Sequence, residues 1–217
     1  DGRQCGRPPG LLLWTPVVES GGKRMRIGCV ILASGESVRF GSNKLLADFG
    51  GKPMLTHLLD ALPSGLQCVV VTRSEAVRAL AEAQGLPCIL HHLPEVRDTI
   101  RLGLEALSGT QGCLFCVGDQ PLLTRETLQK VLAEYAAYPD SIVRAAFEGR
   151  EGNPAIFPPT LYGELCELRE GEAGVTVIRR HADRVRTVEA GFAEELTDAD
   201  TPDTLQTLES FLKTHKE

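Results

Sequence analysis

The stretch IGCVILASGESVRFGSNK, residues 27–44, joins an unbroken apolar run to a loop with two glycines and two positive charges. A short apolar run bounded by turn residues is typical of a buried strand. Glycines after such a strand allow backbone N–H groups to turn toward a phosphate chain. Arg39 and Lys44 would add positive charge to this loop. The stretch therefore predicts a phosphate-binding loop, with an ordinary strand-to-helix turn as the alternative.

The familiar phosphate-loop patterns do not fit this spacing. A Walker loop needs a glycine pair five residues apart followed at once by Lys, whereas here Ser42 and Asn43 separate Gly41 from Lys44. The dinucleotide pattern G-x-G-x-x-G is absent. A nucleophile elbow centred on Ser37 would need glycine where Arg39 stands. The loop belongs to another class of nucleotide site, if it is one.

Working outward, apolar strand-like runs alternate with helical patterns along the rest of the chain. The strand-like runs are 27–32, 67–72, 87–91, 113–117, 141–146 and 184–188, and the helical ones are 53–62, 74–84, 96–107, 124–137, 159–169, 174–181 and 202–214. This alternation predicts a three-layer α/β fold with a mostly parallel central sheet. Ligands of such sheets bind at the carboxyl ends of the strands.

The domain boundaries follow from the same pattern. Residues 1–24 show no periodicity, and we expect them to be an unstructured or non-native extension. No linker divides residues 25–217, which we expect to form one domain. Residues 147–180 could form a small cap within it.

Two acidic segments would meet the loop at the same edge of the sheet. Asp119 follows the apolar run 113–117 directly after Gly118, and Asp198 and Asp200 precede the last helical pattern. A carboxylate beside a phosphate chain is the usual way in which proteins hold Mg²⁺. The alternatives are a turn before Pro121 for Asp119 and helix capping for Asp200. Capping by Thr201 would leave Asp200 free for a metal.

Composition excludes several classes of protein. The net charge of −6 argues against a general nucleic-acid binder, and no apolar run reaches the roughly 20 residues of a membrane span. Seven scattered cysteines favour a reducing, cytoplasmic location over a disulfide scaffold. The pair Cys113 and Cys116 lies in a strand-like run, where we expect core packing. His91 and His92 are adjacent on a strand and would point in opposite directions, which disfavours a metal site.

Five segments together resemble the nucleotidyltransferases of molybdenum cofactor maturation. They are LASGESVRFGSNKLL (32–46), GDQPLL (118–123), GNPAIF (152–157), GEAGVTV (171–177) and DADTPD (198–203). The third and fourth are similar to segments of the cytidylyltransferase branch. The resemblance implies a Rossmann-like nucleotidyltransferase fold over about residues 26–212. It also implies transfer of CMP from CTP to molybdopterin with release of pyrophosphate.

The resemblance also implies residue roles. The nucleotide would meet the backbone of Leu32, Ala33, Ser34 and Gly35, and the triphosphate would be neutralised by Arg39 and Lys44. Thr72 and His92 would approach the base or ribose, and Mg²⁺ would bind Asp119 and Asp200. Molybdoenzyme maturation proteins are the partners that it suggests.

The chain departs from the family pattern where the acceptor should bind. Asn153 replaces a usual His, Val175-Thr176 replaces Ala-Arg, and residues 97–100 differ from the usual Gly and Ser-Leu. Ser34 stands where the guanylyl branch usually has a second Gly, which favours CTP. The alternatives are GTP, a sugar phosphate or other small phosphate as acceptor, and a non-catalytic nucleotide-binding protein of the same pathway.

Overall fold

A seven-stranded sheet forms the centre of the computed structural model, which describes residues 18–20, 23–35 and 43–215. The strand order is β11-β9-β10-β8-β3-β6-β7. The strands are β3 (Gly28–Ala33), β6 (Gln67–Thr72), β7 (Cys88–Leu90), β8 (Cys113–Val117), β9 (Ile142–Phe147), β10 (Arg150–Phe157) and β11 (Val185–Glu189). Strands β7, β6, β3 and β8 are parallel, and so are β11 and β9. The predicted mostly parallel α/β fold is confirmed.

One strand of this sheet is absent from the predicted elements. Strand β10 runs antiparallel to both β8 and β9, and its register shifts between Glu151 and Ala155. The bond between Asn153 and Pro154 is cis within this irregular stretch. Glycine and proline interrupt the alternation of apolar and polar residues by which strands are recognised. The segment 147–180, expected as a cap, therefore begins inside the central sheet.

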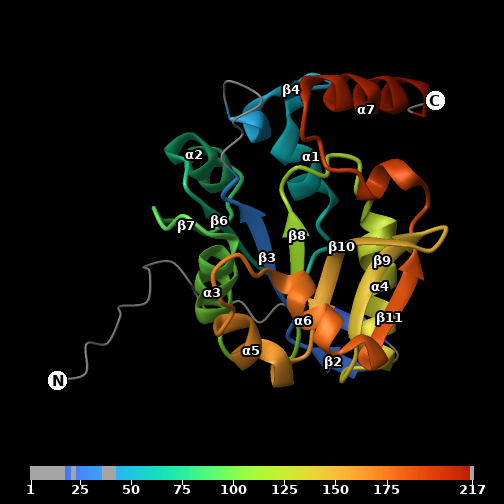
Figure 1. Ribbon diagram of the computed structural model, residues 1–217. Helices are drawn as coiled ribbons and strands as arrows, with labels where there is room; N and C mark the ends of the chain where they lie inside the picture. Colours follow the sequence, from blue (N-terminus) through green and yellow to red (C-terminus); the bar gives the residue numbers. More distant parts are fainter. Residues whose placement is uncertain (1–17, 21–22, 36–42, 216–217) are drawn as a thin grey trace.

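Helices cover both faces of the sheet, which gives three layers; Figure 1 looks onto the strands, which are spread across the view from β7 to β11. One face packs against α1 (Met54–Ala61), α2 (Glu75–Ala83) and α4 (Arg125–Ala137), and the other against α3 (Val96–Ala106), α5 (Tyr162–Cys166) and α6 (Gly174–Arg180). Successive residues of β3 alternate between the two layers, since Cys29 belongs to the first core and Val30 to the second. Helix α7 (Pro202–Thr214) packs outside the sheet on a smaller cluster around Phe49 and Leu208.

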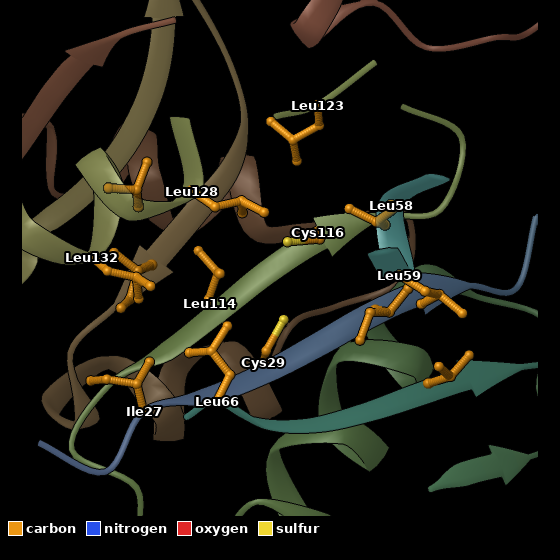
Figure 2. Close-up of a cluster of buried hydrophobic side chains, with 14 of the residues drawn as sticks. Ile27, Cys29, Leu58, Leu59, Leu66, Leu114, Cys116, Leu123, Leu128 and Leu132 are labelled. Atoms are coloured by element: carbon orange, nitrogen blue, oxygen red, sulfur yellow. The ribbon is translucent and has the colours of Figure 1, made fainter. Parts of the chain in front are cut away.

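The first of these cores contains Cys29 of β3 and Cys116 of β8. Figure 2 shows Cys29 and Cys116 among leucines of α1 and α4. Cys113 and Cys116 are both fully buried, in the two different cores. The expectation that they pack as small apolar side chains is confirmed.

The helix starts follow the capping residues of the sequence. The hydroxyl of Ser74 accepts the N–H of Val77 at the start of α2, and that of Thr124 accepts the N–H of Thr127 at the start of α4. Each cap satisfies a backbone donor that the helix itself leaves unpaired. These caps fix where the helices begin, and hence where the preceding loops end at the sheet edge.

Part of the expected N-terminal extension is ordered. Strand β1 (Val18–Ser20) pairs antiparallel with β2 (Lys23–Met25), with Val18 opposite Met25. This hairpin lies against α4, so the domain begins before Met25; residues 1–17 lie outside the described part of the chain. Two shorter strands, β4 (Asp48–Phe49) and β5 (Lys52–Pro53), pair before α1. Among the described residues, no helix has the length and apolar character needed to cross a bilayer.

Candidate active site

Lys44 lies between two aspartates at the carboxyl edge of the sheet. Its Nζ is 2.6 Å from Oδ2 of Asp119 and 2.7 Å from Oδ1 of Asp200. Lys44 begins a short 3₁₀ turn (Lys44–Leu46), and the side chain of Asn43 accepts the N–H of Leu45 at the start of that turn. The turn therefore fixes the direction in which the lysine leaves the backbone. Three segments far apart in the sequence meet at one ammonium group.

Asp119 is placed by the end of β8. The N–H of Gly118 donates to the carbonyl of Leu32 on β3 at 3.0 Å. A Cβ at position 118 would come within 3.3 Å of that carbonyl and of the side chains of Leu45 and Leu55. A side chain here would be tightly packed, so glycine favours the close approach of β3 and β8. The contact brings Asp119 beside the loop that carries Lys44.

Asp200 is free to reach the site because its neighbour caps the helix. The hydroxyl of Thr201 accepts the N–H of Thr204 at the start of α7, as the sequence alternative required. The N–H of Ala199 donates to the backbone carbonyl of Asp119 at 2.8 Å, which docks this segment onto the end of β8. The side chain of Asp200 keeps 58% exposure, whereas that of Asp119 keeps 20%. The pair therefore offers one sheltered and one open carboxylate.

Charge balance at the site favours a protonated lysine. Burial by itself lowers the pKa of Lys44, but the hydrogen bonds that Lys44 donates to Asp119 and Asp200 and the charges of these carboxylates outweigh it and raise the pKa above the ordinary value. The ammonium group is therefore charged at neutral pH. It provides a fixed positive charge in a chain whose net charge is negative.

Asp198 and Gln120 form a second polar pair, of which the sequence analysis considered Asp198 and missed Gln120. Nε2 of Gln120 donates to Oδ1 of Asp198 at 2.9 Å and to the carbonyl of Leu196 at 3.1 Å. Burial, followed by the charge of Asp119, raises the pKa of Asp198 to about 6. Gln120 is 1% exposed, and its Oε1 has no hydrogen-bond partner among the residues that the structure describes. The position of Gln120 next to Asp119 was the one sequence signal that could have identified it as a site residue.

The predicted nucleotide-contact residues fall into two groups. Leu32 lines a cavity, and Ala33, Ser34 and Gly35 follow it at the end of β3. Thr72 is fully buried, and its hydroxyl donates to the carbonyl of Ala33 at 2.8 Å. That hydroxyl supports the end of β3 and is not presented to a ligand.

His92 and Arg39 are the remaining residues predicted to contact the nucleotide. His92 is exposed, and its neighbour His91 is the histidine that contacts the loop, through Ser34. The contact of His92 with the base or ribose stays a prediction, and both histidines follow the end of β7 at Leu90. Arg39 lies outside the described residues.

A cavity of about 430 Å³ opens beside Asp198 and Gln120, which are among its lining residues. Its walls come from the central strands β3, β8, β9 and β10 and from α3, α5 and α6. Most lining side chains are apolar, and the polar ones are Gln120, Arg144, Glu151, Asn153 and Asp198. Nη1 of Arg144 lies 2.9 Å from Oε2 of Glu151, so the charge of this arginine is already balanced. The cavity suits a largely apolar body that reaches the acids at one end.

Residues 29–185 match the model of the MobA-like NTP transferase domain. The chain belongs to the MobA-like NTP transferase domain family. This finding confirms the nucleotidyltransferase class of the domain and its fold, while the finer molybdenum cofactor branch is not distinguished. The matched range contains Lys44 and Asp119 but ends before Asp198 and Asp200.

Comparisons with curated and solved proteins agree with this family. The chain is 31% identical over 161 residues to the bifunctional protein GlmU of Acidithiobacillus ferrooxidans, covering 71% of this chain and 33% of that protein. The chain thus spans about a third of the length of the curated relatives it matches. Rv0371c of Mycobacterium tuberculosis H37Rv superposes with a TM-score of 0.74 at 25% identity, covering 85% of this chain and 98% of that one. A CMP:2-keto-3-deoxy-manno-octonic acid synthetase solved with CTP shares the fold, with a TM-score of 0.71, 16% identity, and coverage of 87% and 99%.

A divalent metal is typical of this NTP transferase family, and the residues present fit one. The carboxylates of Asp119 and Asp200 both converge on Nζ of Lys44, and hard oxygen donors of this kind suit Mg²⁺ or Mn²⁺. No group of three or more His, Cys, Asp or Glu side chains among the described residues could hold a metal alone. A bound cation would therefore share its coordination with substrate phosphates and water. A second structure of Rv0371c is a complex with manganese, with a TM-score of 0.68 to this chain at 25% identity.

Proposed function

We propose that the protein transfers a nucleotide, CMP from CTP, to the phosphate of molybdopterin and releases pyrophosphate. The observation that carries the proposal is the convergence of Lys44, Asp119 and Asp200 beside a largely apolar cavity. A polyphosphate needs cations in an otherwise acidic protein, and this edge of the sheet supplies a buried one. The reaction class also follows from the family.

The reaction needs alignment and charge cancellation more than proton transfer. The phosphate oxygen of the acceptor is already ionised at neutral pH, so no general base is required to activate it. Lys44 would stabilise the negative charge that moves toward the leaving pyrophosphate. Asp119 and Asp200 would hold Mg²⁺, which when bound neutralises phosphate charge and orients the two reacting groups. Arg39 is proposed as a second cation on the triphosphate.

The nucleotide and the acceptor would occupy different parts of the site. The nucleotide would lie against the backbone of Leu32 to Gly35, and the acceptor would place its body in the cavity. The apolar walls, including Phe115 and Phe157, fit a flat ring system better than a bare sugar. The LASG and GNP segments support CTP over GTP through their similarity to the cytidylyl branch. Transfer to a sugar phosphate or another small phosphate is the second candidate, because the reaction class permits it without any change at the acids.

A turnover assay tests the proposal. The purified chain is incubated with Mg²⁺ and each of CTP, GTP, ATP and UTP, with molybdopterin or a panel of sugar phosphates, and pyrophosphate is measured. Pyrophosphate release with CTP and molybdopterin supports the proposal, and the Asp119→Asn variant serves as the inactive control. Pyrophosphate release only with a sugar phosphate would show that the acceptor is a sugar phosphate and not molybdopterin. Nucleotide binding without any release would favour the non-catalytic alternative.

A further inference from the structure

The side chains of Thr72, Arg73 and His91 form hydrogen bonds with Ala33 and Ser34, where the chain leaves β3. The Thr72 hydroxyl donates to the carbonyl of Ala33, and Nε of Arg73 donates to the carbonyl of Ser34 at 2.9 Å. The hydroxyl of Ser34 donates to the carbonyl of Val71 at 3.2 Å and lies 2.9 Å from Nε2 of His91. Two consecutive carbonyls and one side chain are thus engaged by the protein.

The hydrogen bonds of His91 define which ring nitrogen carries the proton. The N–H of Leu93 donates to Nδ1 of His91 at 3.2 Å, so Nδ1 must be the unprotonated nitrogen. Nε2 then carries the proton and donates to Ser34, with the hydroxyl of Thr99 as a more distant neighbour at 3.3 Å. The Ser34 hydroxyl both accepts and donates, which leaves it no proton for a ligand.

We propose that His91 is a positioning residue, which acts through the Ser34 hydroxyl to fix the backbone of Ala33 to Gly35 against the nucleoside triphosphate. The inference rests on the proposed function. It assigns to Ser34 a role different from the direct contact that the sequence predicted.

The physical reason is repulsion between negative oxygens. Carbonyl oxygens that face a triphosphate would oppose binding, because both carry negative charge. Donors from Thr72 and Arg73 engage the carbonyls of Ala33 and Ser34, and the His91 bond prevents the peptide from rotating back. Arg73 also reaches the carbonyl of Pro94 at 3.4 Å, so the loop after β7 and the end of β3 form one unit. Loosening one bond should therefore weaken nucleotide binding without unfolding the domain.

The electrostatic surroundings of His91 agree with this arrangement. Burial, followed by the charge of Arg73, lowers the pKa of His91, and Asp98 opposes that shift while His92 and Arg101 add to it. The neutral ring that the geometry requires is thus the favoured form. Protonation at acid pH would place a proton on Nδ1 against the N–H of Leu93 and break the arrangement.

A double-mutant cycle tests the inference with CTP and Mg²⁺ as the probe in titration calorimetry. The variants are His91→Leu, His91→Gln, Ser34→Ala and the double variant His91→Leu with Ser34→Ala. Glutamine can place an N–H donor near the position of Nε2, so it should retain most of the affinity. Loss of one such hydrogen bond should weaken CTP binding about fivefold in His91→Leu. His215→Gln, at the exposed end of α7, is the matched control for removing a histidine.

The outcomes separate the two proposals. Coupling is expected, so the double variant should bind CTP about as well as Ser34→Ala alone. The ratio of wild-type to His91→Gln affinity should also fall at acid pH, once His91 becomes protonated, a comparison in which titration of CTP itself cancels. Additive effects, or a His91→Leu variant that binds like the wild type, would overturn the positioning role alone. A wild-type chain that binds none of the four triphosphates would overturn the proposed function and this inference with it.

Discussion

Nζ of Lys44 and Oδ2 of Asp119 lie 2.6 Å apart although 75 residues separate them in the chain. The side chain of Lys44 is 9% exposed, so this pair is sheltered from solvent on the lysine side. A sheltered charge acts on a reacting phosphate with little screening by water. We therefore expect Lys44 to contribute strongly to turnover.

Replacing Lys44 by Met should lower kcat/KM for pyrophosphate release by roughly 10²–10³, because a preorganised charge of this kind is worth about that much. The control is Lys52→Met, since Lys52 pairs with Asp60 in an exposed position away from the acids. The control should keep full turnover. A Lys44→Met variant within a few-fold of wild-type turnover would exclude the lysine from catalysis.

Removal of divalent cations should abolish turnover, because Asp119 and Asp200 would then face the phosphates without a neutralising ion. EDTA is added, and activity is measured again after addition of Mg²⁺ or Mn²⁺ in excess. In thermal unfolding, CTP at a hundredfold excess over its Kd should stabilise the wild type by about 2.7 kcal/mol, with Mg²⁺ present. In Asp119→Asn the Mg²⁺ concentration needed for this shift should rise. Turnover that survives EDTA would contradict the metal assignment.

Replacing Asp198 by Asn should stabilise the metal-free protein, and more at pH 8 than at pH 4.5. The folded pKa of Asp198 is about 6, above its ordinary value of 3.8. Between these values the folded state binds more protons, so stability falls as pH rises through about 6. The variant avoids that loss and keeps an oxygen acceptor for Gln120. Urea unfolding with a chelator present should show a gain of about 1–2 kcal/mol at pH 8, whereas an equal gain at both pH values would contradict the assignment.

Narrowing the cavity should weaken binding of the acceptor and leave binding of the nucleotide unchanged. Val175 lines the cavity and is 41% exposed, so Val175→Trp can fill the entrance without disturbing the core. The KM for the acceptor should rise at least about tenfold, as a lost apolar contact plus a steric block would give. The Kd for CTP should stay unchanged in calorimetry. A parallel loss of CTP affinity would place the nucleotide in this cavity.

The core cysteines should resist alkylation in the folded protein. Cys29, Cys113 and Cys116 are fully buried, and burial raises the pKa of half-buried Cys88 to about 11. Thiolates are the reactive form, so iodoacetamide at pH 7.5 should label these positions only after unfolding. Peptide mapping before and after urea treatment measures this. Rapid labelling of Cys116 in the native protein would contradict the core packing.

The fold was predictable from sequence where each strand or helix carries its own local signal. Apolar runs gave β3, β6 and β8, and Thr124 and Thr201 marked the starts of α4 and α7. Strand β10 was not predictable, because it is held by pairing with β8 and β9 while its own residues include the Gly152 to Pro154 break. A strand that pairs antiparallel with two others depends on residues far away in the chain, which a short stretch of sequence does not contain.

The charged residues of the candidate site were predictable from sequence, but the hydrogen bonds that support them were not. The convergence of Lys44, Asp119 and Asp200 followed from the rule that parallel strands end at one edge. The pairing of His91 with Ser34 depends on where β7 ends, which the sequence does not mark to within one residue. Burial of the Thr72 hydroxyl likewise became visible only from three-dimensional packing.

The bond from the N–H of Ala199 to the carbonyl of Asp119 has a consequence for how the protein is made on the ribosome. A nascent chain that has emerged only as far as β11 can assemble every strand of the central sheet, yet it lacks the second carboxylate. Competence for chemistry would arrive only after the segment before α7 has been synthesised and has docked. Scaffold and reactivity are thus acquired at separate moments during translation.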